Sequence, residues 1–398
     1  MGTKQIVGLL IAVVAIVGAI LYLGNGKARP SAFAGPAQEI ILPIAGDSMA
    51  YASTTLGGDS MATDRADGSR VAAKSARYAR AKELVAPAGF INTGGKPIKI
   101  ADYVGKKVIL LDIMTYSCIN CIRTFPYVTD WYAKYEDKGL VVIGIHTPEF
   151  EFEKSIDNVT AAMQKYGVKF PVVLDNDYGT WTAYNNMYWP RKYLIDIDGF
   201  IRYDHIGEGG YAETEKVIRD LLRERAEVLD QKVDLDVSVT KGQSEGGSIG
   251  QSPETYIGGA RNALLANGEP GTSGVQDLVV PRELSTSRLY LGGSWNIQPE
   301  HAESVGAGSS IVYPFIAKKV FLVMSSDIAM DVEVLVDGKP VAASDRGEDV
   351  RAFGNRSVVT VSESRLYSLY AGAASGRHTI TLIAPGKGLR AFAFTFGG

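Results

Sequence analysis

The hydrophobic pattern of the first 84 residues has two parts. Residues 6–23 form an uncharged apolar run of 18 residues, just long enough to cross a bilayer core of ~30 Å as a helix. Residues 25–84 are rich in Ala, Gly, Ser and Asp and show no sustained periodicity. We therefore expect a transmembrane signal anchor at residues 1–24 and then a flexible tether, with a short helix near 73–84. The AFA segment at residues 32–34 leaves a cleaved signal as the alternative.

Between residues 85 and 230, short apolar runs alternate with amphipathic, helix-like patterns. The run 107–113 is almost continuously apolar, as expected of a central strand that is buried on both faces. Asp198 and Gly199 form a turn signal between two further strand-like runs. This alternation predicts an α/β domain. The predicted strands are 97–100, 107–113, 140–146, 172–174, 191–195 and 200–203, and the predicted helices are 122–138, 152–166, 180–185 and 213–229.

The pattern changes again after residue 230. Residues 231–251 are polar and end in a Gly/Ser-rich stretch, which predicts a linker. Residues 252–398 begin with a part-helical stretch near 252–265 and continue as many short strand-like runs, which predicts an all-β jelly-roll sandwich. The Asp337-Gly338 pair is a hairpin signal. The predicted strands are 288–291, 295–297, 310–315, 320–324, 330–336, 358–361, 366–369, 378–383 and 389–396.

Composition narrows the classes of function. An apolar fraction of 46% allows the chain to bury a core, and a net charge of −3 argues against nucleic acid as a main partner. The sequence holds no Gly-rich phosphate-binding loop. Its four histidines are too scattered to indicate a metal site, so we expect no metal. They are His146, His205, His301 and His378.

The only two cysteines are Cys118 and Cys121, between a predicted strand and a predicted helix. A Cys-x-x-Cys pair is either a redox couple or a tight structural bridge. The thiolate is the attacking species in disulfide exchange, and the free N–H groups at a helix N-terminus favour it. We therefore expect Cys118 to be the nucleophile and Cys121, one turn later and more buried, to resolve the mixed disulfide. Beyond this redox-active disulfide we expect no cofactor.

Three residues lie at offsets that suit this chemistry. Asp112 is near the end of a buried strand, where a desolvated carboxyl could shuttle the proton of Cys121. A solvent-exposed or helix-capping Asp is the alternative. Pro126 lies inside the following helix. Pro190 precedes a predicted strand, where a cis-proline would bring backbone beside Cys118, and a trans loop proline is the alternative.

The neighbouring residues indicate a groove for a partner. We expect Trp189 to pack beside Cys118 and shape this groove, with a core role as the alternative. Glu149 follows a central strand, at the end of the sheet where sites usually lie. It could tune the cysteines or face solvent. Tyr116 and Ser117, directly before Cys118, complete the predicted groove.

Taken together, these motifs resemble thioredoxin. The 68 residues between Cys121 and Pro190 are similar to the exported TlpA/ResA branch, which carries a central insert. The likeness to DipZ-like proteins is closer. In that family a β-sandwich with carbohydrate-binding-module-like topology follows the thioredoxin domain. The segments that carry this likeness are 89–93 (GFINT), 115–124 (TYSCINCIRT), 146–150 (HTPEF), 188–196 (YWPRKYLID), 252–258 (SPETYIG) and 391–397 (AFAFTFG).

The resemblance implies a thiol-disulfide oxidoreductase that acts on exported cysteine-containing proteins, with reduction as the favoured direction. Oxidation and isomerisation stay open. It implies a membrane-anchored protein outside the cytoplasm, with cleavage and secretion as the alternative. Many DipZ-like proteins carry a multi-helix CcdA-type module in front. Because this sequence has one apolar span there, we expect a separate membrane electron donor of CcdA type.

Other functions remain for the pair and for the sandwich. Thr115-x-x-Cys118 matches the end of the peroxiredoxin motif, but Leu111 replaces its proline. A structural disulfide and a zinc half-site shared across a dimer are further alternatives. Ile122 excludes haem attachment, which needs Cys-x-x-Cys-His. In a different class, the sandwich binds a glycan or a protein and the redox domain is accessory. Exposed aromatic residues would support this, and the candidates are Trp295, Tyr313, Tyr367 and Tyr370.

Overall fold

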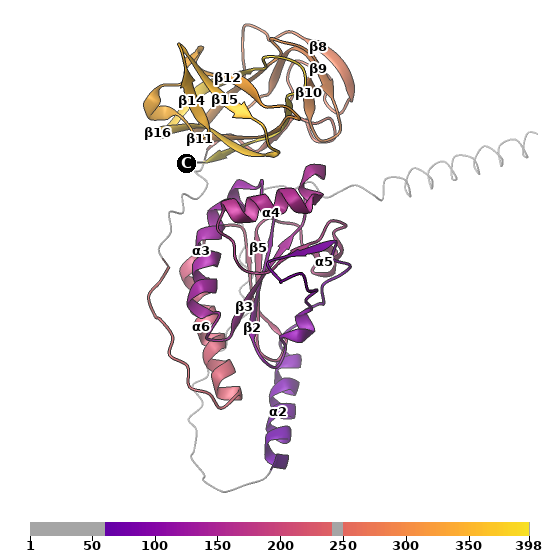
Figure 1. Cartoon of the computed structure of the whole chain (residues 1–398), viewed down its shortest axis with the longest axis vertical. Helices are drawn as coiled ribbons and strands as arrows, with labels where there is room; N and C mark the ends of the chain where they lie inside the picture. Colours follow the sequence, from indigo (N-terminus) through magenta and orange to yellow (C-terminus); the bar gives the residue numbers. More distant parts are fainter. Residues whose placement is uncertain (1–59, 241–249, 398) are drawn as a thin grey trace, which may run out of the picture. The chain divides into compact units, whose positions relative to one another are not determined.

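A six-stranded mixed sheet forms the centre of the first part of the described chain (Figure 1). The computed structural model describes residues 60–240 and 250–397. The strand order is β1-β4-β3-β2-β5-β6, in which β2, β3 and β4 are parallel and the other pairs are antiparallel. The strands are β1 Gly89–Ile91, β2 Val108–Met114, β3 Leu140–His146, β4 Val172–Leu174, β5 Arg191–Ile195 and β6 Ile201–Ile206.

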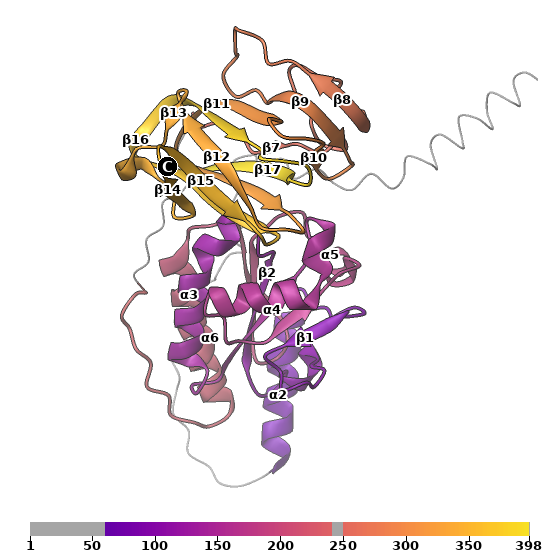
Figure 2. The same cartoon turned by 45° about the horizontal axis from the view of Figure 1, so that its top comes forward.

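Helices cover both faces of this sheet. The larger core lies between the sheet and α3, α4 and α6, and a second core on the opposite face includes residues of α5 and η2. In both Figure 1 and Figure 2, α3 and α6 lie side by side, and the rings of Tyr127 and Tyr211 stack between them at 3.5 Å. The helices are α2 Ser60–Ser75, η2 Ile100–Asp102, α3 Ile119–Tyr135, η3 Glu151–Lys154, α4 Ile156–Lys165, α5 Gly179–Ala183 and α6 Tyr211–Val228.

The alternation of side chains along β2 places Asp112 on the α3 side of the sheet. Leu110 and Met114 belong to the core under α3, whereas Leu111 and Ile113 belong to the core on the opposite face. Successive side chains of a strand point to opposite faces, so Asp112 shares the face of Leu110 and Met114. Every residue of β2 is buried, as its apolar run predicts.

The bounds of β3, β4 and β5 agree with the sequence-based prediction, but the predicted strand at 97–100 is wrong. Carboxylates take the backbone N–H groups there: Asp102 accepts from Lys99, and Glu83 accepts from Ile100 and Ala101. The segment therefore turns into η2 instead of pairing. The strand at the β4 edge of the sheet is instead β1, which pairs with β4.

The segment before the sheet differs from the predicted tether. Helix α2 ends at Ser75, so the helix expected near 73–84 is wrong. The chain then follows the hairpin between β5 and β6: Ala81 N–H bonds to the Gly199 carbonyl and Ile201 N–H to the Ala79 carbonyl, both at 2.9 Å. Residues from about 79 onward therefore belong to the domain.

The second part of the described chain is a β-rich, antiparallel region. Its main path is β14-β15-β12-β16-β11-β17-β10-β9-β8, with β13 paired to β12, β7 to β17, and an additional pairing of β11 with β9. The strands are β7 Thr255–Tyr256, β8 Gly274–Leu278, β9 Tyr290–Ile297, β10 Ala302–Ser304, β11 Ser310–Ser325, β12 Met330–Val336, β13 Lys339–Pro340, β14 Val350–Phe353, β15 Arg356–Val361, β16 Arg365–Ile383 and β17 Arg390–Gly397.

Several predictions for this region needed correction. Two predicted pairs of short strands are single long strands, β11 and β16, whose mutual pairing continues across register shifts near Ala317 and Val320. The helical stretch expected near 252–265 is wrong, because it contains β7 and turns. The Asp337-Gly338 hairpin is confirmed between β12 and β13. The four candidate platform aromatics are buried in the core of this region, so they offer no exposed surface: Trp295, Tyr313, Tyr367 and Tyr370.

The two parts meet in an apolar cluster, and all described residues fall within one compact unit. Ile119 and Phe150 of the first part pack with residues of β11, β16 and β17. The Phe392 ring contacts the rings of Phe150 and Phe152 edge-to-face, with centroids 5.1 and 4.9 Å apart. Ile119 directly follows Cys118, so the β-rich region packs beside the cysteine pair.

Within residues 60–240 and 250–397, no helix combines the length and apolarity that a bilayer crossing needs. The predicted anchor at 6–23, the AFA segment at 32–34 and most of the predicted tether lie outside the described residues.

Candidate active site

Cys118 and Cys121 lie at the first turn of α3, at the end of the sheet where β2 stops. Cys118 is the N-cap residue, with extended backbone angles, and its carbonyl accepts the N–H of Ile122 at 3.0 Å. Cys118 is half-buried and Cys121 is fully buried, and both are free thiols. The pair therefore has the asymmetry that the sequence predicted.

The electrostatic setting of Cys121 favours its protonated form. Burial raises the pKa of this thiol well above its ordinary value, and a hydrogen bond with Cys118 and the charge of Asp112 act in the same direction. A backbone hydrogen bond from Thr115 opposes them. Deprotonation of Cys121 therefore calls for a nearby proton acceptor.

Asp112 is completely buried and has Lys192 as its counter-charge. The two residues are cross-strand partners in the β2–β5 pair, and Lys192 Nζ lies 3.3 Å from Asp112 Oδ1. Burial raises the pKa of Asp112, and Lys192 opposes that shift. The solvent-exposed alternative for Asp112 is excluded by its burial. Lys192 was missed by the sequence reasoning, because a Lys in a strand is expected to face solvent.

Trp189 and Pro190 directly precede β5. The Trp189–Pro190 peptide bond is cis, as predicted. Trp189 is half-buried, donates from Nε1 to the Thr147 carbonyl at 3.0 Å, and packs on Trp181 with centroids 4.3 Å apart. Met187, just before it, is 51% exposed. The segment before β5 therefore presents apolar surface to solvent.

The other three predicted groove residues point into the protein. The Tyr116 side chain is buried and donates to the Ser364 carbonyl of the β-rich region at 2.9 Å. Ser117 is buried and donates to Glu153. The Glu149 carboxylate accepts from Arg261 Nη1 of the same β-rich region, at 2.9 Å. The β-rich region and Glu153 cover these side chains, which the sequence could not reveal.

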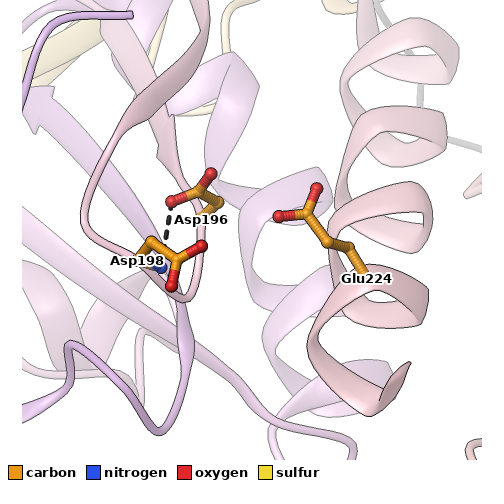
Figure 3. A group of neighbouring side chains, drawn as sticks. All are labelled: Asp196, Asp198 and Glu224. Carbon is orange, nitrogen blue, oxygen red and sulfur yellow. Dashed lines mark hydrogen bonds between the residues drawn. The ribbon is translucent and has the colours of Figure 1, made fainter. Parts of the chain in front are cut away.

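Three carboxylates, those of Asp196, Asp198 and Glu224, lie close together away from the cysteines (Figure 3). Lys74 Nζ lies 2.8 Å from Asp196 and 2.6 Å from Asp198, and it also pairs with Glu224. Arg202 bonds to Asp196 and Glu224. In the described part of the chain this is the single such group with metal-ligand spacing, and the Lys74 ammonium occupies the place of a cation. The cluster instead fixes α2 to the domain.

Two family models match the chain, one for each part. The model described as the AhpC/TSA family matches residues 79–204, and the model described as a thioredoxin-like C-terminal domain matches residues 252–397. The first covers β1 to β5, most of β6 and the cysteine pair. The second covers the β-rich region.

Protein DipZ of Mycobacterium tuberculosis is 35% identical over 321 residues, which are 80% of this chain and 43% of DipZ. Over this stretch the chain is similar to DipZ. It spans less than half the length of that relative. An aligned stretch of 321 residues in a chain of 398 must include the cysteine pair and part of the β-rich region.

Shorter relatives match the thioredoxin-like domain alone. ResA, a thiol-disulfide oxidoreductase of Bacillus subtilis, is 33% identical over 108 residues, which are 27% of this chain and 57% of ResA. Among solved structures, a thiol-disulfide isomerase from Corynebacterium glutamicum matches at 18% identity and a TM-score of 0.33. That match covers 37% of this chain and 97% of the isomerase. The likeness to thiol-disulfide oxidoreductases rests on the sequence relatives and not on this structural match.

Proposed function

We propose that this chain is a thiol-disulfide oxidoreductase that exchanges electrons with protein substrates through Cys118 and Cys121. The observation that carries the proposal is the pairing of a half-buried Cys118 at a helix N-terminus with a fully buried Cys121 one turn later. Such an arrangement suits a thiolate that attacks a substrate and a second thiol that waits for the mixed disulfide.

The proposed reduction runs in two steps. The Cys118 thiolate attacks a substrate disulfide, a bond forms between Cys118 Sγ and one substrate sulfur, and the other sulfur leaves as a thiolate. The Asp112 carboxylate then takes the proton of Cys121. The Cys121 thiolate attacks Cys118 Sγ, the second substrate thiolate leaves, and two electrons have passed to the substrate. Asp112 suits this task because it lies buried on the α3 face of β2 and influences the pKa of Cys121.

Substrates would approach from the Pro190 side. Met187, just before Trp189 and Pro190, exposes apolar surface there, whereas Tyr116, Ser117 and Glu149 are engaged inside the protein. An extended substrate segment could pair with the backbone at the cis-proline.

We infer that the protein acts as a reductase outside the cytoplasm. The apolar run 6–23 supports a membrane anchor, and a separate donor of CcdA type would keep the pair reduced in an oxidising compartment. Exported cysteine-containing proteins are then the substrates. Release after cleavage near residues 32–34 is the alternative location.

We infer a jelly-roll sandwich for the β-rich region. Its support is an antiparallel strand path and one large core. A glycan or protein ligand for this region stays a proposal. Because the four candidate aromatics are buried, such a ligand would have to bind elsewhere on the region.

The test is dithiothreitol-driven insulin reduction by the full chain, with Cys118→Ser, Cys121→Ser and the double variant. We expect Cys118→Ser to fall to the uncatalysed rate. Cys121→Ser should accumulate a mixed disulfide with the substrate, because attack still occurs and resolution does not. Wild-type activity in Cys118→Ser would refute the proposal. Peroxide consumption that exceeds disulfide reduction would point to a peroxidase instead.

A further inference from the structure

The Glu153 side chain lies between the cysteine segment and the loop after β3, and none of it is exposed. Its Oε1 accepts hydrogen bonds from Thr115 Oγ1 at 2.6 Å and Ser117 Oγ at 2.7 Å. The same oxygen accepts the Ser117 N–H at 3.2 Å. Both residues belong to the short link between β2 and α3 that ends at Cys118. One carboxylate oxygen therefore holds the segment that carries the nucleophile.

The second oxygen of Glu153 holds a different loop. Its Oε2 accepts the N–H groups of Glu149 at 2.5 Å and Phe150 at 3.0 Å. The carboxylate of Glu149 in turn accepts from Tyr256 Oη at 2.7 Å and Arg261 Nη1 at 2.9 Å. Glu153 therefore stands between the cysteine segment and a loop that the β-rich region holds in place.

The position of this segment matters for both thiols. Ser117 directly precedes Cys118, and the Thr115 backbone hydrogen-bonds to Cys121. A shift of this segment would move the attacking and resolving sulfurs relative to each other. Misplacement of reacting groups by about 1 Å can cost about a hundredfold in rate.

The charges around Glu153 are few. Burial raises the pKa of Glu153 to about 7, although the hydrogen bonds from Thr115 and Ser117 favour the carboxylate. His146 Nε2 lies 3.4 Å from Thr115 Oγ1, and burial lowers the pKa of His146 to about 3, so this ring is neutral. Burial also raises the pKa of Tyr116, whose phenol stays protonated. The charge of Glu149, which pairs with Arg261, also raises the pKa of Glu153.

We propose that Glu153 is a positioning residue for the redox site, which fixes the Thr115–Ser117 segment and so sets the reactivity of Cys118. This inference rests on the proposed role of Cys118 as the nucleophile. Glu153 itself touches no reacting atom. It acts by accepting hydrogen bonds from both sides of the segment that leads to the N-cap cysteine.

The Glu153→Gln variant tests this arrangement selectively. The amide NH₂ cannot face Glu149 and Phe150, because their N–H groups only donate. It must turn to the cysteine side, where the Thr115 and Ser117 hydroxyls can rotate to accept, but the Ser117 N–H loses its acceptor. The matched control is Glu151→Gln on the same short helix, whose side chain is 70% exposed.

Two readouts separate positioning from a structural role. The first is the pH profile of iodoacetamide alkylation in a Cys121→Ser background, where Cys118 is the sole thiol. We expect an inflection near the Glu153 pKa of about 7 in this background, and no inflection there once Glu153→Gln is added. The second is the rate of insulin reduction with Cys121 intact, which we expect Glu153→Gln to lower about tenfold or more. Glu151→Gln should match the wild type in both.

A wild-type profile and rate in Glu153→Gln would overturn the inference. If that variant does not fold, Thr115→Val and Thr115→Ser replace it, since only the second keeps the hydroxyl that Glu153 accepts. We then expect slower insulin reduction in Thr115→Val alone, and equal rates in the two would overturn the inference. Failure of the proposed function would give a different result, because Cys118 would then not react with iodoacetamide even when Glu153 and Thr115 are unchanged.

Discussion

Lys192 Nζ lies 3.3 Å from Asp112 Oδ1 across two central strands, and both side chains are at most 1% exposed. A buried ion pair of this kind costs desolvation energy, which its mutual attraction offsets only while both partners are present. The pair thus keeps a charge-bearing carboxyl on the Cys121 face of the sheet.

The Asp112–Lys192 pair should behave as a coupled unit. Lys192→Met leaves the Asp112 carboxylate buried without a counter-charge. Asp112→Asn likewise leaves the Lys192 ammonium buried without a counter-charge. We expect each to lower the free energy of unfolding by about 3–5 kcal/mol, and the double variant to lose much less than the sum. Urea unfolding measures all three. As a control, Lys216→Met breaks the exposed pair with Asp220 and should cost at most about 1 kcal/mol. Additive losses in the double variant would contradict this account.

Glu153 should make stability depend on pH. Its folded-state pKa of about 7 lies above its ordinary value of 4.5, so between these values the folded state binds the proton and the unfolded state does not. This contribution is complete below the ordinary value and is lost as the pH rises through about 7, a decrease of about 3 kcal/mol. Urea unfolding across this range should show the decrease in the wild type and in Glu151→Gln. An equal decrease in Glu153→Gln would assign it to another group, such as Asp112.

Phe392 should be a main contact between the two parts. It is 4% exposed and lies edge-to-face against Phe150 and Phe152. Phe392→Ala removes a buried ring, and we expect it to lower the free energy of unfolding by about 3–5 kcal/mol. Phe353→Ala is the matched control, since that ring is 48% exposed and should change stability by about 0.5 kcal/mol at most. Similar urea midpoints for the two variants would show that Phe392 is not such a contact.

The sequence predicted the central part of the site because local signals define it. Strand β2, the helix after Cys118 and the cis peptide at Pro190 each follow from a short segment. Lys192 and Glu153 could not be predicted, because their burial depends on distant partners. Glu153 ends a run in which Glu and Phe alternate, and nothing in that run indicates which carboxylate is buried.

The strands of the β-rich region were harder to predict from the sequence for a related reason. Its long strands β11 and β16 contain Lys and Gly residues that resemble turn signals in the sequence, and the structure uses those places as register shifts or mid-strand positions. The aromatic side chains could be assigned to surface or core only once the strands were paired. Trp295 and Tyr313 are in the core.

The reduction potential of the Cys118–Cys121 couple tests the central claim most directly. The full chain would be equilibrated in glutathione buffers of graded ratio, and the disulfide fraction read by alkylation and mass. The account predicts a single two-electron transition at ~−250 mV or below, as a reductase requires. A transition near ~−120 mV would contradict the reducing role, and the absence of any transition would contradict the redox couple itself.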